Sequence, residues 1–178
     1  MKIVIIGGGP GGYVAAIRCA QYGGEVTVIE KSHLGGTCVN EGCIPTKALL
    51  KGVQPLLEWK HFKAMGFTAD NPTIDKNKLQ KHVQKTVKMS RQGINYLMKK
   101  NNINVVNGEA IGYGKKTVIV KRDDVEEEIP YDKLILAMGS IPAGIPGIHV
   151  DGEKIVYSDV PLKIEKIPTS LLIVGGGV

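Results

Sequence analysis

Residues 2–12 read KIVIIGGGPGG, a continuous apolar run followed at once by a turn rich in glycine. An apolar run without alternation is typical of a β-strand that is buried on both faces, as in a parallel sheet. Tyr13–Tyr22 then has a helical pattern that ends at Gly23, and Glu25–Ile29 supplies a second apolar strand. Strand, turn, helix and strand within about thirty residues predict a βαβ unit and an α/β fold.

The glycine turn carries a recognisable spacing. Gly7, Gly9 and Gly12 match G-x-G-x-x-G between a strand and a helix, as the motif requires. The first glycine allows the tight turn, the second lets the backbone approach a pyrophosphate, and the third lets helix and strand pack closely. The pyrophosphate would lie at the helix N-terminus, where N–H groups and the helix dipole favour an anion. Glu30, which ends the second strand, is placed to accept hydrogen bonds from a ribose, so the motif predicts a dinucleotide site but does not separate FAD from NAD.

A second glycine-rich stretch, GGTCVNEGCIPTK at residues 35–47, contains Cys38 and Cys43. On a regular helix residues five apart have Cα atoms ~8.7 Å from each other, beyond the ~7 Å limit for a disulfide. We expect Asn40 and Gly42 to let the backbone tighten and bring the two sulfur atoms together.

The cysteine pair has several interpretations. Half of a zinc site would need more ligands, and only scattered histidines are available. Buried structural thiols fit poorly among so many glycines, and a static disulfide is disfavoured in a reducing cytoplasm. A redox-active pair, with no metal, is therefore favoured: Cys43 would begin a helix, whose N-terminus stabilises a thiolate, and Lys47 would add positive charge one turn later. Cys19 is interpreted as a core residue.

The middle of the chain predicts helices. Asp75 is expected to cap a long helix from Lys76 to about Lys100, with an apolar stripe along one face. Gln54–Pro55 is expected to break the helix that starts near Cys43, because proline disfavours a helical residue before it.

Strands are predicted on either side of a proline-rich connector. Val105–Ile129 alternates and turns, which predicts a small insertion of three antiparallel strands, and Lys133–Ala137 reads as another buried strand. Ser140–Thr169 reads as a connector with little regular structure. Leu171–Val174 is expected to be a buried strand that opens a second glycine turn, Gly175–Val178.

Length and composition fit a soluble globular protein. The chain has 178 residues, 43% of them apolar and 22% charged, which excludes disorder, and its three cysteines are too few for a disulfide scaffold. The apolar stretch Ile3–Ile17 is too short and glycine-rich to span a membrane. We expect a cytoplasmic protein with a dinucleotide-binding domain at residues 1–145, and a connector and the start of a second domain at 146–178, cut from a longer chain.

With both motifs in place, the chain resembles the N-terminal part of the flavin-dependent pyridine nucleotide–disulfide oxidoreductases over its whole length. Within that family the ending IPTK at residues 44–47 resembles the branch that oxidises dihydrolipoamide more than the glutathione-reducing branch, where VPKK is usual. The branch that reduces mercuric ions shares the residues CVN at 38–40, so this branch remains an alternative assignment. Residues 108–110 resemble the segment that meets the adenine, and residues 137–140 resemble the family stretch ATGS, with Met138 in place of threonine.

The resemblance implies a Rossmann-like FAD-binding domain and two catalytic cysteines. Cys43 would lie against the isoalloxazine ring as the charge-transfer thiolate, Cys38 would exchange with the substrate, and Lys47 would lie near the reactive flavin nitrogen. The cofactor-binding residues that it implies are Gly7, Gly9, Pro10, Gly11, Gly12, Glu30, Lys31, Gly36, Thr37, Cys38, Cys43, Lys47, Glu109, Ala110, Ala137, Met138, Gly139 and Ser140.

The resemblance also implies a reaction and partners. Electrons would pass from dihydrolipoamide through the disulfide to FAD and then to NAD+, in a homodimer that serves a lipoyl-bearing acyltransferase or carrier protein of a 2-oxo acid or acetoin dehydrogenase complex. In the family the NAD domain, the rest of the FAD domain and a His–Glu pair come from segments absent here. We therefore expect this chain to bind flavin weakly and to lack turnover.

Two other classes of function compete. The net charge of +6 and a row of basic residues between 76 and 100 suggest a nucleic-acid or acidic-partner binding module. A solvated helix face is the better interpretation, because only 5% of the residues are aromatic and no aromatic platform is available for stacking bases. A simple NAD-dependent Rossmann dehydrogenase would leave Cys38 and Cys43 unexplained. We expect neither nucleic acid nor a membrane as partner.

Overall fold

The structure is a computed structural model that describes residues 1–158 and 168–176. It divides into two compact units, Met1–Ile141 and Pro142–Val178. The described residues of the second unit form turns and irregular segments without a helix or strand, as predicted for the connector. The assignment of residues 1–145 and 146–178 to domains of different function stays a prediction.

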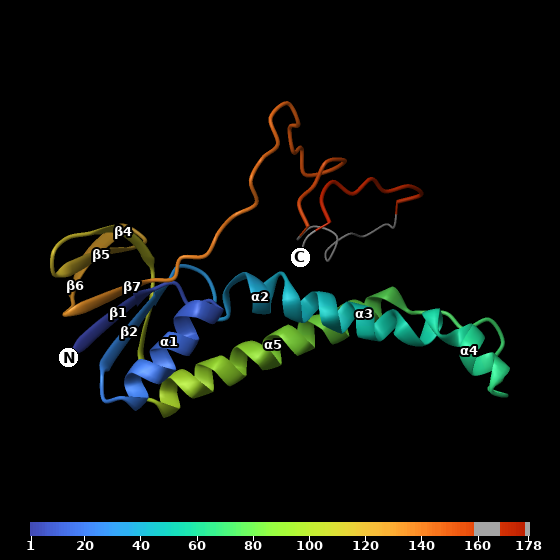
Figure 1. Cartoon of the computed structure of the whole chain (residues 1–178), viewed down its shortest axis with the longest axis horizontal. Helices are drawn as coiled ribbons and strands as arrows, with labels where there is room; N and C mark the ends of the chain where they lie inside the picture. Colours follow the sequence, from blue (N-terminus) through green and yellow to red (C-terminus); the bar gives the residue numbers. More distant parts are fainter. Residues whose placement is uncertain (159–167, 177–178) are drawn as a thin grey trace. The chain divides into compact units, whose positions relative to one another are not determined.

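The first unit is built on a four-stranded parallel sheet (Figure 1). Its strands are β1 (Lys2–Ile6), β2 (Glu25–Glu30), β3 (Asn104–Asn107) and β7 (Lys133–Leu136), in the order β3-β2-β1-β7. All three pairings are parallel, so the carboxyl ends of the strands meet at one edge of the sheet. The predicted α/β fold class is confirmed.

Both faces of the sheet are covered, which explains why β1 is apolar from Ile3 to Ile6; only its first residue, Lys2, is charged and exposed. Ile3 and Ile5 belong to a core that includes Ala16 of the first helix and Met98 of the long helix. Val4 and Ile6 belong to a second core, which they share with residues of the antiparallel sheet described below. Alternate residues of β1 thus serve opposite layers, and no position from Ile3 to Ile6 is left for a polar side chain.

Two helices pack on the first face. Helix α1 (Pro10–Gln21) begins earlier than the predicted Tyr13, because Pro10 suits the first turn of a helix and the two glycines that follow also adopt helical geometry. Helix α5 (Lys76–Lys100) matches the prediction, and the Asp75 carboxylate caps it by accepting a 3.0 Å hydrogen bond from the Lys78 backbone N–H.

Three helices connect β2 to α5. They are α2 (Gly36–Asn40), α3 (Cys43–Leu57) and α4 (Trp59–Ala64). The predicted break at Gln54–Pro55 is wrong, since α3 continues through Pro55 to Leu57. Proline has helical φ and removes a single backbone donor, so it weakens a helix without having to end it.

The antiparallel sheet contains β4 (Glu109–Tyr113), β5 (Thr117–Arg122) and β6 (Val125–Pro130), in that order. The predicted three-stranded insertion is confirmed. Val105 does not belong to it: Val105 lies in β3 and pairs in parallel with Val28 of β2. The insertion therefore begins only after Asn107.

The predicted buried strand at Leu171–Val174 is wrong. These four residues form no strand, and their exposed fractions lie between 65% and 88%. An apolar run becomes a strand only where a neighbour satisfies its backbone groups, and no described segment pairs with this one. Gly177 and Val178, the end of the predicted second glycine turn, lie outside the described residues.

Candidate functional site

The glycine turn follows β1 at the carboxyl edge of the parallel sheet. Gly7 has φ +100°, and a Cβ there would fall on the carbonyl oxygen of Ala137, so no other residue fits. The Gly7 N–H donates a 2.8 Å hydrogen bond to the Ile29 carbonyl, which fixes the turn to the end of β2. The structure therefore bears out the expected need for glycine at this position.

The N-terminus of α1 opens directly from this turn. Gly9 is the N-cap, Pro10 occupies the first turn, and no side chain of the described residues caps the helix. The first N–H groups of a helix have no partner within it, so they are available to an anion. A Cβ on Gly12 would strike the Gly7 carbonyl, which shows how closely the helix packs on the turn.

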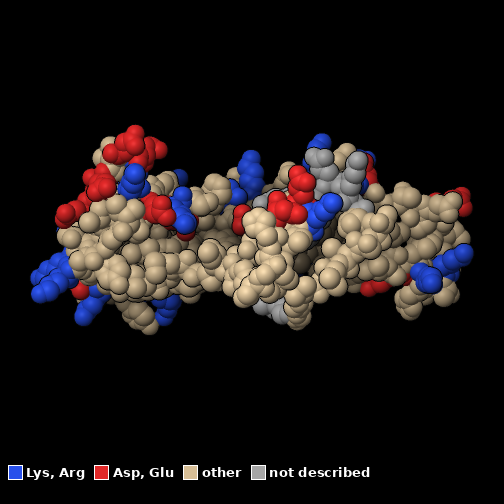
Figure 2. Space-filling model, turned by 90° about the horizontal axis from the view of Figure 1, so that it is seen from above, with Lys and Arg blue, Asp and Glu red and all other residues tan. Residues whose placement is uncertain are grey.

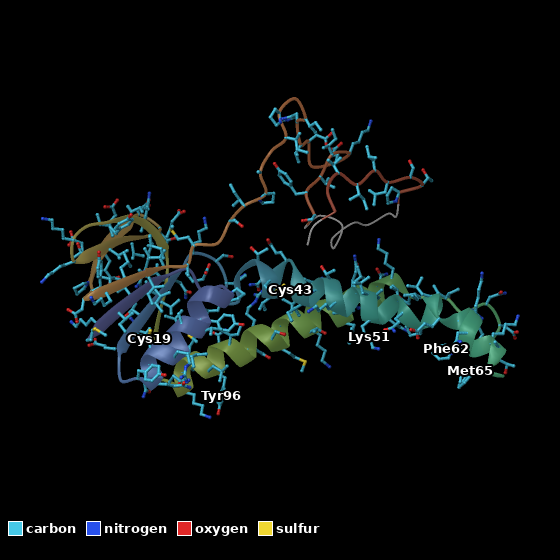
Figure 3. The ribbon with its side chains drawn as sticks, in the orientation of Figure 1. Cys19, Cys43, Lys51, Phe62, Met65 and Tyr96 are labelled. Atoms are coloured by element: carbon cyan, nitrogen blue, oxygen red, sulfur yellow. A yellow bond between two sulfur atoms is a disulfide. The ribbon has the colours of Figure 1, made fainter. Side chains whose placement is uncertain are left out.

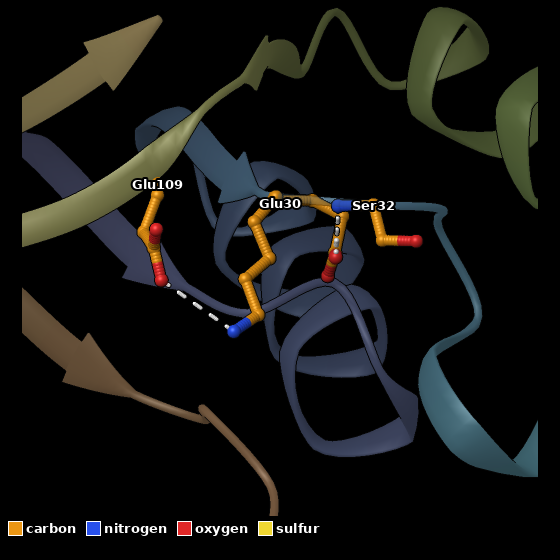
Figure 4. Close-up of polar contacts among 4 residues, drawn as sticks. Glu30, Ser32 and Glu109 are labelled. Atoms are coloured by element: carbon orange, nitrogen blue, oxygen red, sulfur yellow. Dashed lines mark hydrogen bonds and ion pairs between the residues drawn. The ribbon is translucent and has the colours of Figure 1, made fainter.

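Glu30 holds the turn in place through Gly8 and also accepts a hydrogen bond from Ser32, which Figure 4 shows. One oxygen of its carboxylate accepts a 2.7 Å hydrogen bond from the Gly8 N–H and the other a 2.8 Å bond from the Ser32 N–H. Each carboxylate oxygen can accept a further bond, so the predicted contact with a ribose stays compatible with this geometry. The sequence did not reveal the contact with Gly8, because the motif leaves that position open.

The start of β4 lies beside the end of β2. The Gly108 N–H donates a 3.0 Å hydrogen bond to the Glu30 carbonyl, and Lys31 forms a 3.5 Å ion pair with Glu109 (Figure 4). Both side chains of that pair are mostly exposed, so it contributes little to stability. Ala110, half-buried, packs against the second core.

The segment after β7 lies on the other side of the glycine turn. The Ala137 N–H donates a 2.8 Å hydrogen bond to the Ile6 carbonyl, and its Cβ would lie 3.6 Å from a Cβ on Gly12. Met138 is 67% exposed and Gly139 has φ +75°. Ser140 is also exposed.

The strand order indicates where a ligand would lie. From β1 the chain proceeds to β2 on one side, whereas β7 lies on the other side of β1. In open α/β sheets, ligands bind outside the carboxyl ends of the strands at such a reversal. The structure therefore gathers the predicted residues after β1, β2 and β7, together with the first residues of β4, at one edge.

The second glycine segment touches the first. Gly35, with φ +101°, donates a 2.8 Å hydrogen bond from its N–H to the Gly8 carbonyl. A Cβ on Gly36 would lie 2.7 Å from the Gly9 Cα. Side chains at these positions would separate the two backbones, so the glycines allow α2 to start against the N-terminus of α1. Thr37, the next residue, is exposed.

Cys38 and Cys43 form a disulfide with a Cα–Cα distance of 4.6 Å, as expected from the sequence. Cys38 lies on α2 and is half-buried, whereas Cys43 is exposed and begins α3 (Figure 3). Between them the helix is interrupted for two residues. The backbone turns at Gly42, the N-cap of α3, where φ is −126° and ψ is −103°, whereas Asn40 belongs to α2, so the expected tightening occurs at Gly42 and not at Asn40.

Two further candidate residues, Lys47 and Cys19, lie on helices α3 and α1. Lys47 lies one turn into α3, is exposed and forms no ion pair within the described part of the chain. Cys19 is a free thiol on α1, half-buried against the first core (Figure 3). Among residues 1–158 and 168–176, no group of His, Cys, Asp or Glu could hold a metal ion.

The site fits the phosphates and ribose of a dinucleotide. A Cβ on Gly9 would meet only the Gly36 Cα, at 3.6 Å, so the glycine leaves space between the two turns that a side chain would fill. The uncapped N–H groups at the start of α1 are available to an anion there, and the Glu30 carboxylate lies beside the same turn. These residues fit FAD, which the resemblance implied.

Surface charge does not mark a continuous basic face on the side that Figure 2 shows. Lys and Arg are spread along it, and acidic side chains gather near the end that carries the antiparallel sheet. The exposed acidic residues there are Asp123, Asp124, Glu126, Glu127 and Glu128. No described helix is both long and apolar enough to cross a lipid bilayer.

Comparisons with known proteins agree on one group. Residues 1–178 match the family described as pyridine nucleotide-disulphide oxidoreductase. A dihydrolipoyl dehydrogenase of Bacillus subtilis is 43% identical over all of this chain, and one of Geobacillus stearothermophilus is 40% identical over 99% of it. The chain spans 39% and 37% of the length of these two relatives.

Two solved structures have a fold similar to that of this chain. The crystal structure of LpdA from Mycobacterium tuberculosis has a TM-score of 0.81 and 26% identity, over 94% of this chain and 38% of its own. RclA of Escherichia coli, an HOCl-induced flavoprotein disulfide reductase solved as a Cu(II) complex, has a TM-score of 0.76 and 27% identity, over 94% of this chain and 35% of its own.

Proposed function

Since the chain belongs to the pyridine nucleotide-disulphide oxidoreductase family, we propose that it provides the FAD and disulfide site of a dihydrolipoyl dehydrogenase. One observation carries the proposal: the Cys38–Cys43 disulfide spans α2 and α3, and the first residue of α2 touches the N-cap of α1. A reactive disulfide and a dinucleotide turn therefore belong to one continuous site.

The cofactor would be held by the groups that the structure gathers at the sheet edge. The N–H groups at the start of α1 would bind the pyrophosphate, Glu30 the ribose, and the backbone of residues 109–110 the adenine. Residues 36–37 and 137–140 would flank the rest of the molecule, and Lys47 would lie near its reactive ring. When bound, FAD supplies the two-electron chemistry that links thiols to a pyridine nucleotide.

The cysteines would exchange with a dithiol substrate in two steps. A substrate thiolate attacks the Cys38 sulfur and releases Cys43 as a thiolate, which the N-terminus of α3 and the Lys47 charge stabilise. The second substrate thiol then displaces Cys38 and leaves as the disulfide. The substrate loses two electrons and two protons: the cysteine pair gains both electrons, one proton passes to the Cys38 sulfur and the other to solvent, and Cys43 stays a thiolate.

The complete reaction and its partners belong to the proposal. The chain spans less than two fifths of the length of the relatives, so the parts of those relatives that it does not match would supply nicotinamide binding. We propose oxidation of dihydrolipoamide with NAD+ in a cytoplasmic homodimer that serves a lipoyl-bearing carrier protein or acyltransferase. The ending IPTK favours this branch over the glutathione-reducing branch.

Counting thiols in the denatured protein tests the exchange step. The structure predicts one free thiol, that of Cys19, before reduction and three after one equivalent of dihydrolipoamide. Cys38→Ser and Cys43→Ser should each show two thiols with or without the reagent. Cys19→Ser, the matched control, should change from none to two.

Three thiols in the untreated protein, counted after denaturation, would contradict the disulfide. A pair that strong dithiols reduce but dihydrolipoamide does not would contradict the substrate and leave the redox pair in place.

A further inference from the structure

Asn40 lies between the two cysteines and binds backbone carbonyls that precede them. Its side-chain N–H2 group donates to the Gly36 carbonyl at 2.8 Å and to the Leu34 carbonyl at 3.3 Å, with the His33 carbonyl at 3.5 Å. Its amide oxygen is buried without a hydrogen-bond partner among the described residues. The side chain therefore acts only as a donor, and all its acceptors lie on one short segment.

Two of those carbonyls, of His33 and Leu34, belong to the segment that precedes and anchors α2, and the third belongs to Gly36, the first residue of α2. Gly35 of the same segment donates its N–H to the Gly8 carbonyl at 2.8 Å. Asn40 thus joins the C-terminal end of α2 to residues that are themselves bonded to the first glycine turn. A continuous set of hydrogen bonds connects the cysteine loop to the turn.

Helix α2 needs such support. It has five residues, too few for a helix to be stable by itself, and it carries Cys38. In the oxidised protein the disulfide also closes the loop. In the reduced protein that bond is absent, and the Asn40 side chain then ties the end of α2 to its anchor together with the Val39 N–H, which donates to the Gly35 carbonyl at 3.3 Å.

We propose that Asn40 is a positioning residue that holds the reduced Cys38 and Cys43 thiols close enough to re-form their disulfide. The inference rests on the proposed function, because it concerns the redox equilibrium of the same pair. Without the Asn40 hydrogen bonds the thiols would separate more freely, and closing the disulfide would become less favourable. The pair would then be a stronger oxidant.

The test is the equilibrium between the cysteine pair of the full chain and dithiothreitol, read by counting thiols after acid quenching. In each exchange dithiothreitol forms its cyclic disulfide, and the protein disulfide becomes two thiols. We expect Asn40→Ala to shift the equilibrium constant about tenfold towards the reduced protein, equivalent to ~30 mV for a two-electron couple.

Asn95→Ala is the matched control. The Asn95 side chain donates to the Arg91 carbonyl at 2.9 Å, the same type of bond to a carbonyl four residues earlier, but on α5. We expect its equilibrium constant to equal that of the unmodified chain. Asn40→Asp keeps the size of the side chain and removes the donor, so it should shift the constant as Asn40→Ala does.

The outcomes separate this inference from the proposed function. A folded Asn40→Ala protein with an unchanged constant overturns the positioning role, even if the pair still exchanges with dithiols. Oxidised Asn40→Ala and Asn40→Asp proteins that both fail to fold, judged by circular dichroism, overturn it too, because the residue would then serve the fold as a whole. A pair in the unmodified chain that never exchanges with dihydrolipoamide contradicts the proposed function instead.

Discussion

Gly9 and Gly12 belong to the same glycine motif but have different roles. A Cβ on Gly12 would strike the Gly7 carbonyl, so the packing of α1 on the turn requires glycine there. A Cβ on Gly9 would meet its nearest neighbour, the Gly36 Cα, at 3.6 Å, an ordinary contact. Gly9 is therefore not needed for the fold itself, and the space that it leaves is what a cofactor would use.

Substituting each glycine with alanine should separate stability from binding. We expect Gly12→Ala to lower the free energy of unfolding by about 1–3 kcal/mol, the usual cost of overpacking. Gly9→Ala should leave it within about 0.5 kcal/mol and weaken FAD binding at least about tenfold, or ~1.4 kcal/mol. Urea unfolding and titration with FAD measure the two effects.

Gly93→Ala provides the control for this comparison. Gly93 lies within α5 with open space around it, so alanine should stabilise the chain by about 0.5–1 kcal/mol and leave FAD binding unchanged. Equal FAD affinity in Gly9→Ala and the unmodified protein would show that the pyrophosphate does not approach this backbone.

The residue contacts of the site could be predicted only in part. The spacing of Gly7, Gly9 and Gly12 indicated a phosphate turn because the motif encodes backbone geometry. The contact of Gly8 with Gly35 could not be predicted, because it joins the backbones of two segments that are separated in the chain. The role of Asn40 was missed for a similar reason: its partners are carbonyl groups, which leave no signal in the sequence.

The elements were predictable where their pattern was long or had a clear boundary. The N-cap of helix α5 is confirmed, and of its predicted apolar stripe Val87 and Ile94 are buried, whereas Leu97 is 37% exposed and Met98 is buried in its place. Pro55 predicted the end of α3, but proline has helical φ, and α3 continues for two residues beyond it. Val105–Asn107 was assigned to the wrong sheet, since a short apolar run does not specify its neighbour.

The cap of α5 gives a prediction for this element. Asp75→Ala removes the hydrogen bond to the Lys78 N–H, and we expect it to lower the free energy of unfolding by about 1 kcal/mol. Urea denaturation measures the loss. Asp70→Ala, an exposed position outside any helix, is the control and should change stability little. Equal stability of both variants and the unmodified chain would contradict the assigned cap.

At the scale of the whole molecule, the first unit brings together segments far apart in sequence. Residues 7–12, 30–43, 108–110 and 137–140 meet at the carboxyl edge of one parallel sheet because the strand order places β2 and β7 on either side of β1. The apolar run Leu171–Val174 was expected to be a strand, but no described strand lies beside it. An apolar run is a strand only where another strand lies beside it.

A visible absorption spectrum of the chain, incubated with FAD and separated from free flavin, tests the central claim most directly. It should be recorded before and after one equivalent of dihydrolipoamide, with Cys43→Ser as the control. We predict a flavin band that gains absorbance on its long-wavelength side after reduction, because a Cys43 thiolate then lies against the flavin, and no such gain in Cys43→Ser. A bound flavin whose spectrum changes identically in both proteins would contradict a site shared by the disulfide and the cofactor.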